Sequence, residues 1–229
     1  MDDAHSHVIG FDVYGTLVDP IELKVPLRQF VGDRAERFAA LWREKQIEYS
    51  FRRGLMRVYV DFDVCTRQAL QYTALALAVE LSNADQRGLL AAYRNLAPFP
   101  EARAALEALK RRGHRLFAFS NGVEATVRAL LGHAGLAAYL DNVISVDDLN
   151  TFKPDPAVYQ YLAKRAGTPP EATWLISSNS WDVIGAQAAG LRTAWVQRQS
   201  TTVFDPWGTE PELVVRNLTE LVERLYRLG

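Results

Sequence analysis

Four short stretches of the sequence carry polar side chains directly after an apolar run or directly before a predicted helix. In the first stretch, Asp12 follows the apolar run of residues 8–11, and Thr16 follows a glycine turn at Gly15. The other stretches contain Ser120 with Asn121, then Lys153, and finally Ser177 with Asn179 and Asp182. A carboxylate beside an ammonium group suits nucleophilic catalysis, because the ammonium can hold the carboxylate ionised while hydroxyl and amide groups bind it or position water.

Each of these side chains, taken alone, also has an ordinary structural explanation. Asp12 could only cap a turn, because Asp and Gly are common in turns. Asp182 could cap the helix that follows it, and Lys153 could be a surface lysine. The order of the four stretches favours catalysis, because each one stands where a strand ends or a helix begins.

The elements after Pro98 alternate between strands and helices. In this region, strands are expected at residues 115–119, 143–146, 174–176, 193–196 and 213–215, and helices at 101–112, 123–133, 155–166, 183–189 and 218–228. A further strand is expected at residues 8–11, near the start of the chain. This alternation predicts an α/β fold with a parallel sheet and right-handed crossovers. All strands of a parallel sheet point the same way, so the polar groups at their carboxyl ends converge on one edge, where such sheets bind ligands.

Residues 20–96 have helical periodicity and no convincing strand. Asp33 and Glu36 have the spacing of a capping box, which predicts a helix that begins there. A second helix is expected after Asp61 and a third near Asn83. The segment is therefore predicted to be a helical insertion after the first strand.

Composition indicates an ordinary globular protein rather than a membrane or nucleic-acid binder. The chain has 229 residues, a net charge of -1 and a hydrophobic content of 48%. The near-neutral charge gives no basic footprint for nucleic acid or anionic lipid. Cys65 is the single cysteine, and no Cys/His cluster has zinc spacing. Without a secretory signal or an apolar run of membrane length, a cytoplasmic location is expected.

Read in order, the motifs FDVYGTL, SNG, KPDPAVY and SSNSWD resemble those of the haloacid dehalogenase superfamily, and in particular its L-2-haloacid dehalogenase branch. LWREKQ, with Tyr49, resembles the first long helix of that branch's cap. The resemblance implies a Rossmann-like parallel-sheet core, formed by residues 1–18 and 97–229. It also implies a helical-bundle cap formed by residues 19–96.

The resemblance further implies hydrolysis of short-chain (S)-2-haloacids to (R)-2-hydroxyacids, with inversion at C2, through an ester on Asp12 and without a metal or other cofactor. Arg43 and Asn121 would contact the halide, and Ser120 the substrate carboxylate. The implied catalytic residues are Asp12, Thr16, Arg43, Ser120, Lys153, Tyr159, Ser177, Asn179 and Asp182. The implied substrate-binding residues are Tyr14, Arg43, Phe62, Ser120, Asn121 and Trp181. A homodimer is implied, with the haloacid and halide as partners and neither nucleic acid nor membrane.

Two alternatives stay open at this point. Phosphatases of the superfamily carry Asp-x-Asp-x-Thr, but Tyr14 stands at the second Asp, and Asn179 lies where an acidic pair is usual. Both changes remove oxygen ligands that Mg²⁺ needs, which disfavours a phosphatase. A catalytically silent binding protein on this fold is disfavoured by the intact Asp12 and Lys153, although a fold alone never proves activity. Without the resemblance, Arg43 would be taken as a solvated helix charge, and Phe62 and Trp181 as packing.

Overall fold

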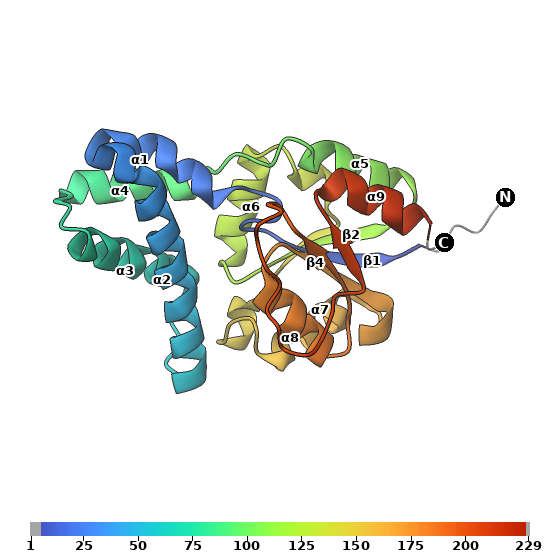
Figure 1. The fold of residues 1–229 in the computed structure, drawn as a ribbon. Helices are drawn as coiled ribbons and strands as arrows, with labels where there is room; N and C mark the ends of the chain where they lie inside the picture. Colours follow the sequence, from blue (N-terminus) through green and yellow to red (C-terminus); the bar gives the residue numbers. More distant parts are fainter. Residues whose placement is uncertain (1–5, 228–229) are drawn as a thin grey trace.

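The computed structural model describes residues 6–227. Its centre is a six-stranded sheet with the order β3-β2-β1-β4-β5-β6, in which every neighbouring pair is parallel (Figure 1). The strands are β1 (Val8–Asp12), β2 (Arg115–Ser120), β3 (Asn142–Ser145), β4 (Thr173–Ser177), β5 (Arg192–Val196) and β6 (Leu213–Val215). The predicted α/β class and parallel sheet are therefore confirmed.

The strand register brings the polar stretches to one edge. Asp12 ends β1 opposite Phe119 of β2, and Ser120 ends β2 opposite Ser145. Ser177 ends β4, the other neighbour of β1. All five residues of β1 are buried, as expected for a strand covered on both faces. Asp12 thus stands at the middle of the carboxyl edge.

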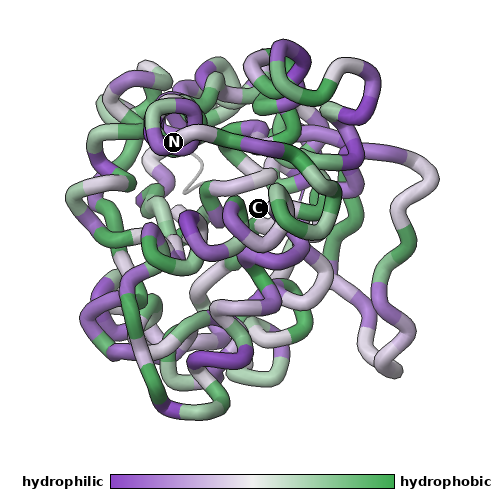
Figure 2. The backbone as a smooth tube through the Cα atoms, turned by 90° about the vertical axis from the view of Figure 1, so that its left-hand side faces the viewer, coloured by the Kyte–Doolittle hydropathy of each residue, from purple (hydrophilic) through white to green (hydrophobic). Residues whose placement is uncertain are grey.

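Helices cover both faces of the sheet. In Figure 1, α5 (Ala102–Arg111) and α9 (Leu218–Tyr226) lie on one side, and α7 (Pro156–Ala166) and α8 (Ser180–Ala188) lie on the other. Another helix, α6 (Glu124–His133), follows β2 and packs beside β3. Hydrophobic and hydrophilic residues follow one another in short stretches along the backbone (Figure 2). Among the described residues, no helix is both long and apolar enough to cross a membrane.

The segment between β1 and α5 forms a separate group of helices at one end of the molecule (Figure 1). These helices are α1 (Lys24–Val31), α2 (Ala35–Met56), α3 (Phe62–Ala76) and α4 (Asn83–Tyr93). Two segments of the chain, residues 17–19 and 97–99, join this group to the sheet, and their backbones are hydrogen-bonded to each other. The amide of Asp19 donates to the carbonyl of Ala97 at 3.1 Å, and the amide of Phe99 donates to that of Leu17 at 3.0 Å.

Several helix boundaries differ from the sequence predictions. The capping box predicted at Asp33 is wrong, because residues 32–34 form a 3-10 turn and Arg34, which precedes α2, makes no side-chain cap. The short helix α1 was not predicted. The helix α8 begins at Ser180 rather than at residue 183, so Asp182 lies inside its first turn. The last helix was predicted to reach residue 228, which lies outside the described residues.

Candidate active site

A buried lysine lies between two carboxylates at the carboxyl edge of the sheet. The Nζ atom of Lys153 donates at 3.0 Å each to Asp12 Oδ1, to Asp182 Oδ2 and to the carbonyl of Phe119. The Lys153 side chain is 1% exposed, so these bonds use all three ammonium donors away from water. Within residues 6–227, no group of three or more His, Cys, Asp or Glu side chains is arranged to hold a metal ion. The Lys153 ammonium lies between the two carboxylates, 3.0 Å from an oxygen of each.

The second oxygen of Asp12 is held by two neutral donors. Its Oδ2 atom accepts from the hydroxyl of Thr16 at 3.0 Å and from Nδ2 of Asn179 at 2.9 Å. The cluster thus fixes the orientation of Asp12 through both of its carboxylate oxygens.

The turn after β1 is tied to the turn after β4. The amide of Ser178 donates to the Thr16 hydroxyl at 2.9 Å, which leaves the hydroxyl hydrogen for Asp12. The Ser178 hydroxyl donates to the carbonyl of Gly15 at 2.8 Å. Gly15 has a φ of +94°, a region that glycine adopts without strain. Ser177 was among the predicted catalytic residues, whereas Ser178 was not. The Ser177 hydroxyl accepts from the amide of Asn179 at 3.1 Å and shapes the same turn.

Asp182 is held from its other side by Tyr159. The Tyr159 hydroxyl donates to Asp182 Oδ1 at 2.8 Å, and both side chains are fully buried. Burial raises the pKa of Tyr159 well above its ordinary value, and the neighbouring carboxylate raises it further, so the phenol remains a donor. Burial also raises the pKa of Asp182, and the charge of Lys153 opposes that effect. Asp182 therefore accepts from Tyr159 and Lys153 together and orients the lysine toward Asp12.

The turn after β2 presents Ser120 and Asn121, which are both buried. The Oδ1 atom of Asn121 accepts from the backbone amide of Lys153 at 2.9 Å, which fixes the orientation of the amide. The Ser120 hydroxyl accepts from the amide of Gly122 at 3.1 Å. These contacts join the second polar stretch to the third.

Arg43 reaches the site from the inserted helices. Its Nη2 atom donates to the carbonyl of Tyr14 at 3.2 Å, and its Nη1 atom donates to Gln46 Oε1 at 2.7 Å. The carbonyl of Tyr14 also accepts from Asn179 Nδ2 at 3.3 Å. The arginine on α2 is therefore anchored two residues from Asp12.

An aromatic cluster lies beside Asp12. The ring of Tyr14 lies 5.9 Å from that of Phe62 and 5.4 Å from that of Tyr93. Burial holds the pKa of Tyr14 well above its ordinary value, so the ring stays uncharged. Trp181 stands apart from this cluster and meets Phe51 of α2 edge to face, with ring centres 5.1 Å apart.

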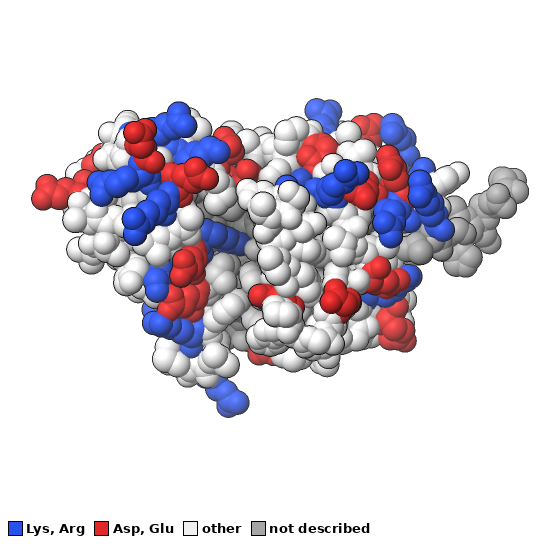
Figure 3. Space-filling model, viewed as in Figure 1, with Lys and Arg blue, Asp and Glu red and all other residues white. Residues whose placement is uncertain are grey.

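A cavity of about 640 Å³ opens between the inserted helices and the sheet. Its lining includes Tyr14, Asn179, the cationic Arg43, Lys24 and Arg198, and the carboxylates of Asp19 and Glu36. Figure 3 shows this region as a hollow with Lys or Arg atoms visible inside it. An anion that entered the cavity would meet cationic side chains next to the Asp12 cluster.

Fold and site together define a class of protein: an α/β chain with a Lys-bridged carboxylate pair at the carboxyl edge of its parallel sheet and a helical segment inserted after the first strand. A family model described as haloacid dehalogenase-like hydrolase matches residues 7–190. The chain belongs to this family, which confirms the resemblance found in the sequence motifs.

The relatives specify the branch of the family. The (S)-2-haloacid dehalogenase of Pseudomonas sp. strain YL is 38% identical over 215 residues, which cover 94% of this chain and 92% of that protein. The haloacetate dehalogenase H-2 of Moraxella sp. strain B is 35% identical and covers 93% of this chain and 95% of its own. The L-2-haloacid dehalogenase of Xanthobacter autotrophicus superposes with a TM-score of 0.88 at 33% identity, covering 97% of this chain and 98% of its own. A second structure of that enzyme, at 32% identity, has chloropropionic acid covalently bound, and it has the same TM-score and coverage.

Proposed function

We propose that this protein hydrolyses the carbon–halogen bond of short-chain (S)-2-haloacids and releases halide and (R)-2-hydroxyacids. The observation that carries the proposal is the Asp12 carboxylate, which accepts from Lys153, Thr16 and Asn179 at 3.0 Å or less beside the guanidinium-lined cavity. The named activities of the relatives support it.

The first step is an in-line displacement. One Asp12 oxygen attacks C2 from the side opposite the halogen, so a carbon–oxygen bond forms while the carbon–halogen bond breaks. The halide leaves with the bonding electrons, and C2 inverts. Arg43 and Asn121 stabilise the negative charge as it develops on the halogen, where electrostatic help lowers the barrier. Ser120 and nearby backbone amides hold the substrate carboxylate.

The second step hydrolyses the ester. A water molecule bound by Asn179 attacks the carboxyl carbon of Asp12, and the bond between this carbon and the ester oxygen breaks. The hydroxyacid leaves with an oxygen that came from Asp12, and the net reaction releases one proton. Ser177 shapes the turn that carries Asn179, while Tyr159 and Asp182 hold Lys153 beside Asp12 throughout.

The two parts of the chain have separate tasks in this scheme. Residues 1–18 and 97–229 form the core that supplies the nucleophile, and residues 19–96 form a cap that supplies Arg43 and Phe62. Tyr14 of the core and Phe62 of the cap form an apolar wall that excludes bulk water, which strengthens the electrostatic contacts around the halogen.

We further infer a homodimer that works in the cytoplasm. Leu55, Met56 and Val58, at and just after the end of α2, are 87%, 61% and 50% exposed, and this run of exposed apolar side chains supports a protein contact there. Light scattering on the purified protein, compared with the chain mass of 25.7 kDa, tests the dimer.

Halide release from the separate enantiomers of 2-chloropropionate tests the activity. We expect chloride and (R)-lactate from the (S) enantiomer and little chloride from the (R) enantiomer. A parallel assay with p-nitrophenyl phosphate and Mg²⁺ tests the phosphatase alternative. Phosphate release without halide release would overturn the proposal in favour of a phosphatase, and inactivity in both assays would favour a binding protein.

A further inference from the structure

The guanidinium of Arg43 is held within the inserted segment by a buried glutamine. Gln46 lies three residues further along α2 and is 0% exposed. Its Oε1 atom accepts from Arg43 Nη1 at 2.7 Å. A buried amide without partners would be costly, so the other contacts of Gln46 decide how firmly it can hold the arginine.

Thr66 of α3 fixes which end of the Gln46 amide faces Arg43. The Thr66 hydroxyl donates to the carbonyl of Phe62 at 2.8 Å, so its single hydrogen is already used. It can therefore only accept from Gln46, and it does so from Nε2 at 2.6 Å. The amide oxygen is consequently turned toward Arg43, where a donor would repel the guanidinium.

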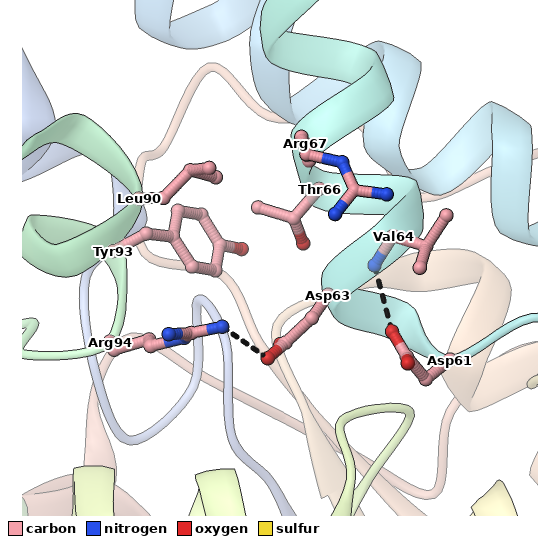
Figure 4. Close-up of a pocket in the computed structure, with 8 residues that line it drawn as sticks. All are labelled: Asp61, Asp63, Val64, Thr66, Arg67, Leu90, Tyr93 and Arg94. Carbon is pink, nitrogen blue, oxygen red and sulfur yellow. Dashed lines mark hydrogen bonds and ion pairs between the residues drawn. The ribbon is translucent and has the colours of Figure 1, made fainter. Parts of the chain in front are cut away.

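Tyr93 of α4 supplies the second bond to that oxygen. Its hydroxyl donates to Gln46 Oε1 at 2.8 Å, and its ring packs on Tyr14 with centres 5.4 Å apart. Burial raises the pKa of Tyr93, so the phenol keeps the hydrogen that it donates. Figure 4 shows Thr66 and Tyr93 on two different helices, lining a pocket of about 220 Å³.

We propose that Gln46 is a positioning residue for Arg43, and that Thr66 and Tyr93 set the orientation of its amide. Three helices of the inserted segment thereby aim one guanidinium at the departing halide. The inference rests on the proposed dehalogenase function and deepens it. An arginine without Gln46 keeps its charge but loses the contact that selects its geometry, and small misplacements of a catalytic group cost up to roughly 100-fold in rate.

The test compares kcat/KM for halide release from (S)-2-chloropropionate and (S)-2-bromopropionate. This parameter reports ester formation, the step in which Arg43 acts. Chloride is the poorer leaving group and depends more on stabilisation of its charge. For Gln46→Met, which keeps the length of the side chain but cannot accept from Arg43, we expect a loss of roughly 10-fold to 100-fold with chloride. We expect a loss several-fold smaller with bromide.

A double-mutant cycle separates positioning from general loosening of the helices. In an Arg43→Lys background, Gln46→Met should cost less than about 2-fold, because its effect passes through the guanidinium. Ser50→Ala is the matched control: Ser50 is also buried on α2, and it donates to the carbonyl of Ile47 at 2.7 Å without touching Arg43. The control should keep the wild-type kcat/KM and halide preference.

Equal losses with chloride and bromide, or full additivity with Arg43→Lys, would overturn the positioning role while the wild type still releases halide. A wild type that releases no halide would instead overturn the proposed function itself, and this inference with it. If Gln46→Met does not fold, Tyr93→Phe removes one bond to the same oxygen and keeps the ring. It should give a smaller loss with the same preference for bromide, and no change in that preference would count against the proposal.

Discussion

At the scale of single residues, the hydrogen bonds of Asp12 determine how it can react. A carboxylate has about four lone-pair sites. The Oδ2 atom accepts from both Thr16 and Asn179, whereas Oδ1 accepts from Lys153 alone. The oxygen beside Lys153 therefore keeps a lone pair for attack on C2, and the other oxygen stays anchored.

The covalent route can be checked by following oxygen through one turnover. With enzyme in excess in heavy-oxygen water, attack by Asp12 gives a hydroxyacid that carries light oxygen, and heavy oxygen enters the peptide that contains Asp12. Direct attack by water on C2 would label the product and leave the peptide light, and that result would refute the ester. Asp12→Asn should lower turnover by on the order of 10,000-fold or more, because the nucleophile is lost.

The role of Arg43 predicts a graded response to substitution. Arg43→Ala should reduce kcat/KM for chloride release by roughly 100-fold to 1000-fold, as when one donor to a developing anion is removed. Arg43→Lys should recover part of the loss, because the charge returns without the planar fork of donors. Circular dichroism of both variants provides the control for folding. Turnover of Arg43→Ala near the wild-type rate would mean that the arginine is only surface charge.

The charge around Asp12 predicts indifference to chelators. Lys153 already bridges Asp12 and Asp182 at 3.0 Å, so the position between the carboxylates is taken by an ammonium group. Dialysis against EDTA should leave halide release unchanged, and added Mg²⁺ should not raise it. Loss of turnover on chelation, followed by recovery with Mg²⁺, would contradict the metal-free mechanism.

At the scale of elements, local sequence signals located the sheet well. Gly113 and Gly167 directly follow the helices predicted at 101–112 and 155–166, and both have the positive φ typical of the residue after a helix, +80° and +68°. Asp12 ends a strand and Lys153 precedes a helix. Because all strands of a parallel sheet point the same way, the sequence alone predicts that the two side chains meet at the carboxyl edge. The meeting of these side chains depends only on where strands end and helices begin, which short stretches of sequence encode.

The contacts between the inserted helices could not be predicted in the same way. Gln46, Thr66 and Tyr93 lie on three helices, and nothing in their spacing indicates that they share hydrogen bonds. The cap of α2 was also wrongly predicted, since a 3-10 turn over residues 32–34 leads into this helix without a side-chain cap. Tertiary packing decides these features, and a single sequence does not reveal it.

A glycine in α8 offers a prediction about how helices hold the site. A Cβ atom at Gly185 would lie 2.6 Å from the hydroxyl of Tyr159 and 2.7 Å from Cβ of Pro154. Gly185→Ala should therefore push α8 away from α7, strain the Tyr159–Asp182 bond and destabilise the protein by about 1–3 kcal/mol. Urea unfolding and halide release should both report the loss.

The matched control is Gly88→Ala on α4. A Cβ atom there would meet nothing within 4 Å, and alanine favours a helix more than glycine does. This variant should be neutral or more stable by up to about 1 kcal/mol. Equal stability of the two variants would show that α7 and α8 tolerate a wider separation than their contacts indicate.

At the scale of the whole molecule, the site depends on how the inserted helices sit over the sheet. Arg198 supports the junction between them: it donates to the carbonyl of Thr16 at 2.5 Å, forms an ion pair with Glu101 and lies over the ring of Phe99. Glu101 also accepts from the amide of Leu218, at the start of α9. Arg198 thus links the turn after Asp12 to the segment that returns from the inserted helices at Phe99, and through Glu101 it also links them to the start of the last helix.

The opposite end of the sheet carries a prediction about stability and pH. His114 is buried there, and its Nδ1 atom accepts from the backbone amide of His7 at 3.0 Å, which requires a neutral ring. Burial, together with the smaller effects of the neighbouring His7 and Arg112, lowers the pKa of His114 to about 4. Between pH 6.5 and 4 the unfolded chain therefore binds a proton at this histidine that the folded chain does not bind. Stability must fall as the pH falls through this range and level off for this group below pH 4.

The contribution of His114 can be isolated with His114→Asn, which keeps an acceptor near the position of Nδ1 but does not titrate. The free energy of unfolding, measured in urea from pH 7 to 4, should decline more steeply for the wild type than for the variant, because only the wild type loses stability through this group. The difference between the two curves should reach roughly 3 kcal/mol at pH 4, given a pKa lowered from 6.5 to about 4. Halide release at pH 7 should be unchanged in the variant, since His114 lies at the amino end of β2 and Asp12 at the carboxyl end of β1. Parallel curves for the two proteins would mean that the folded protein accommodates a charged ring at this position, with the His7 contact contributing nothing to the pH dependence.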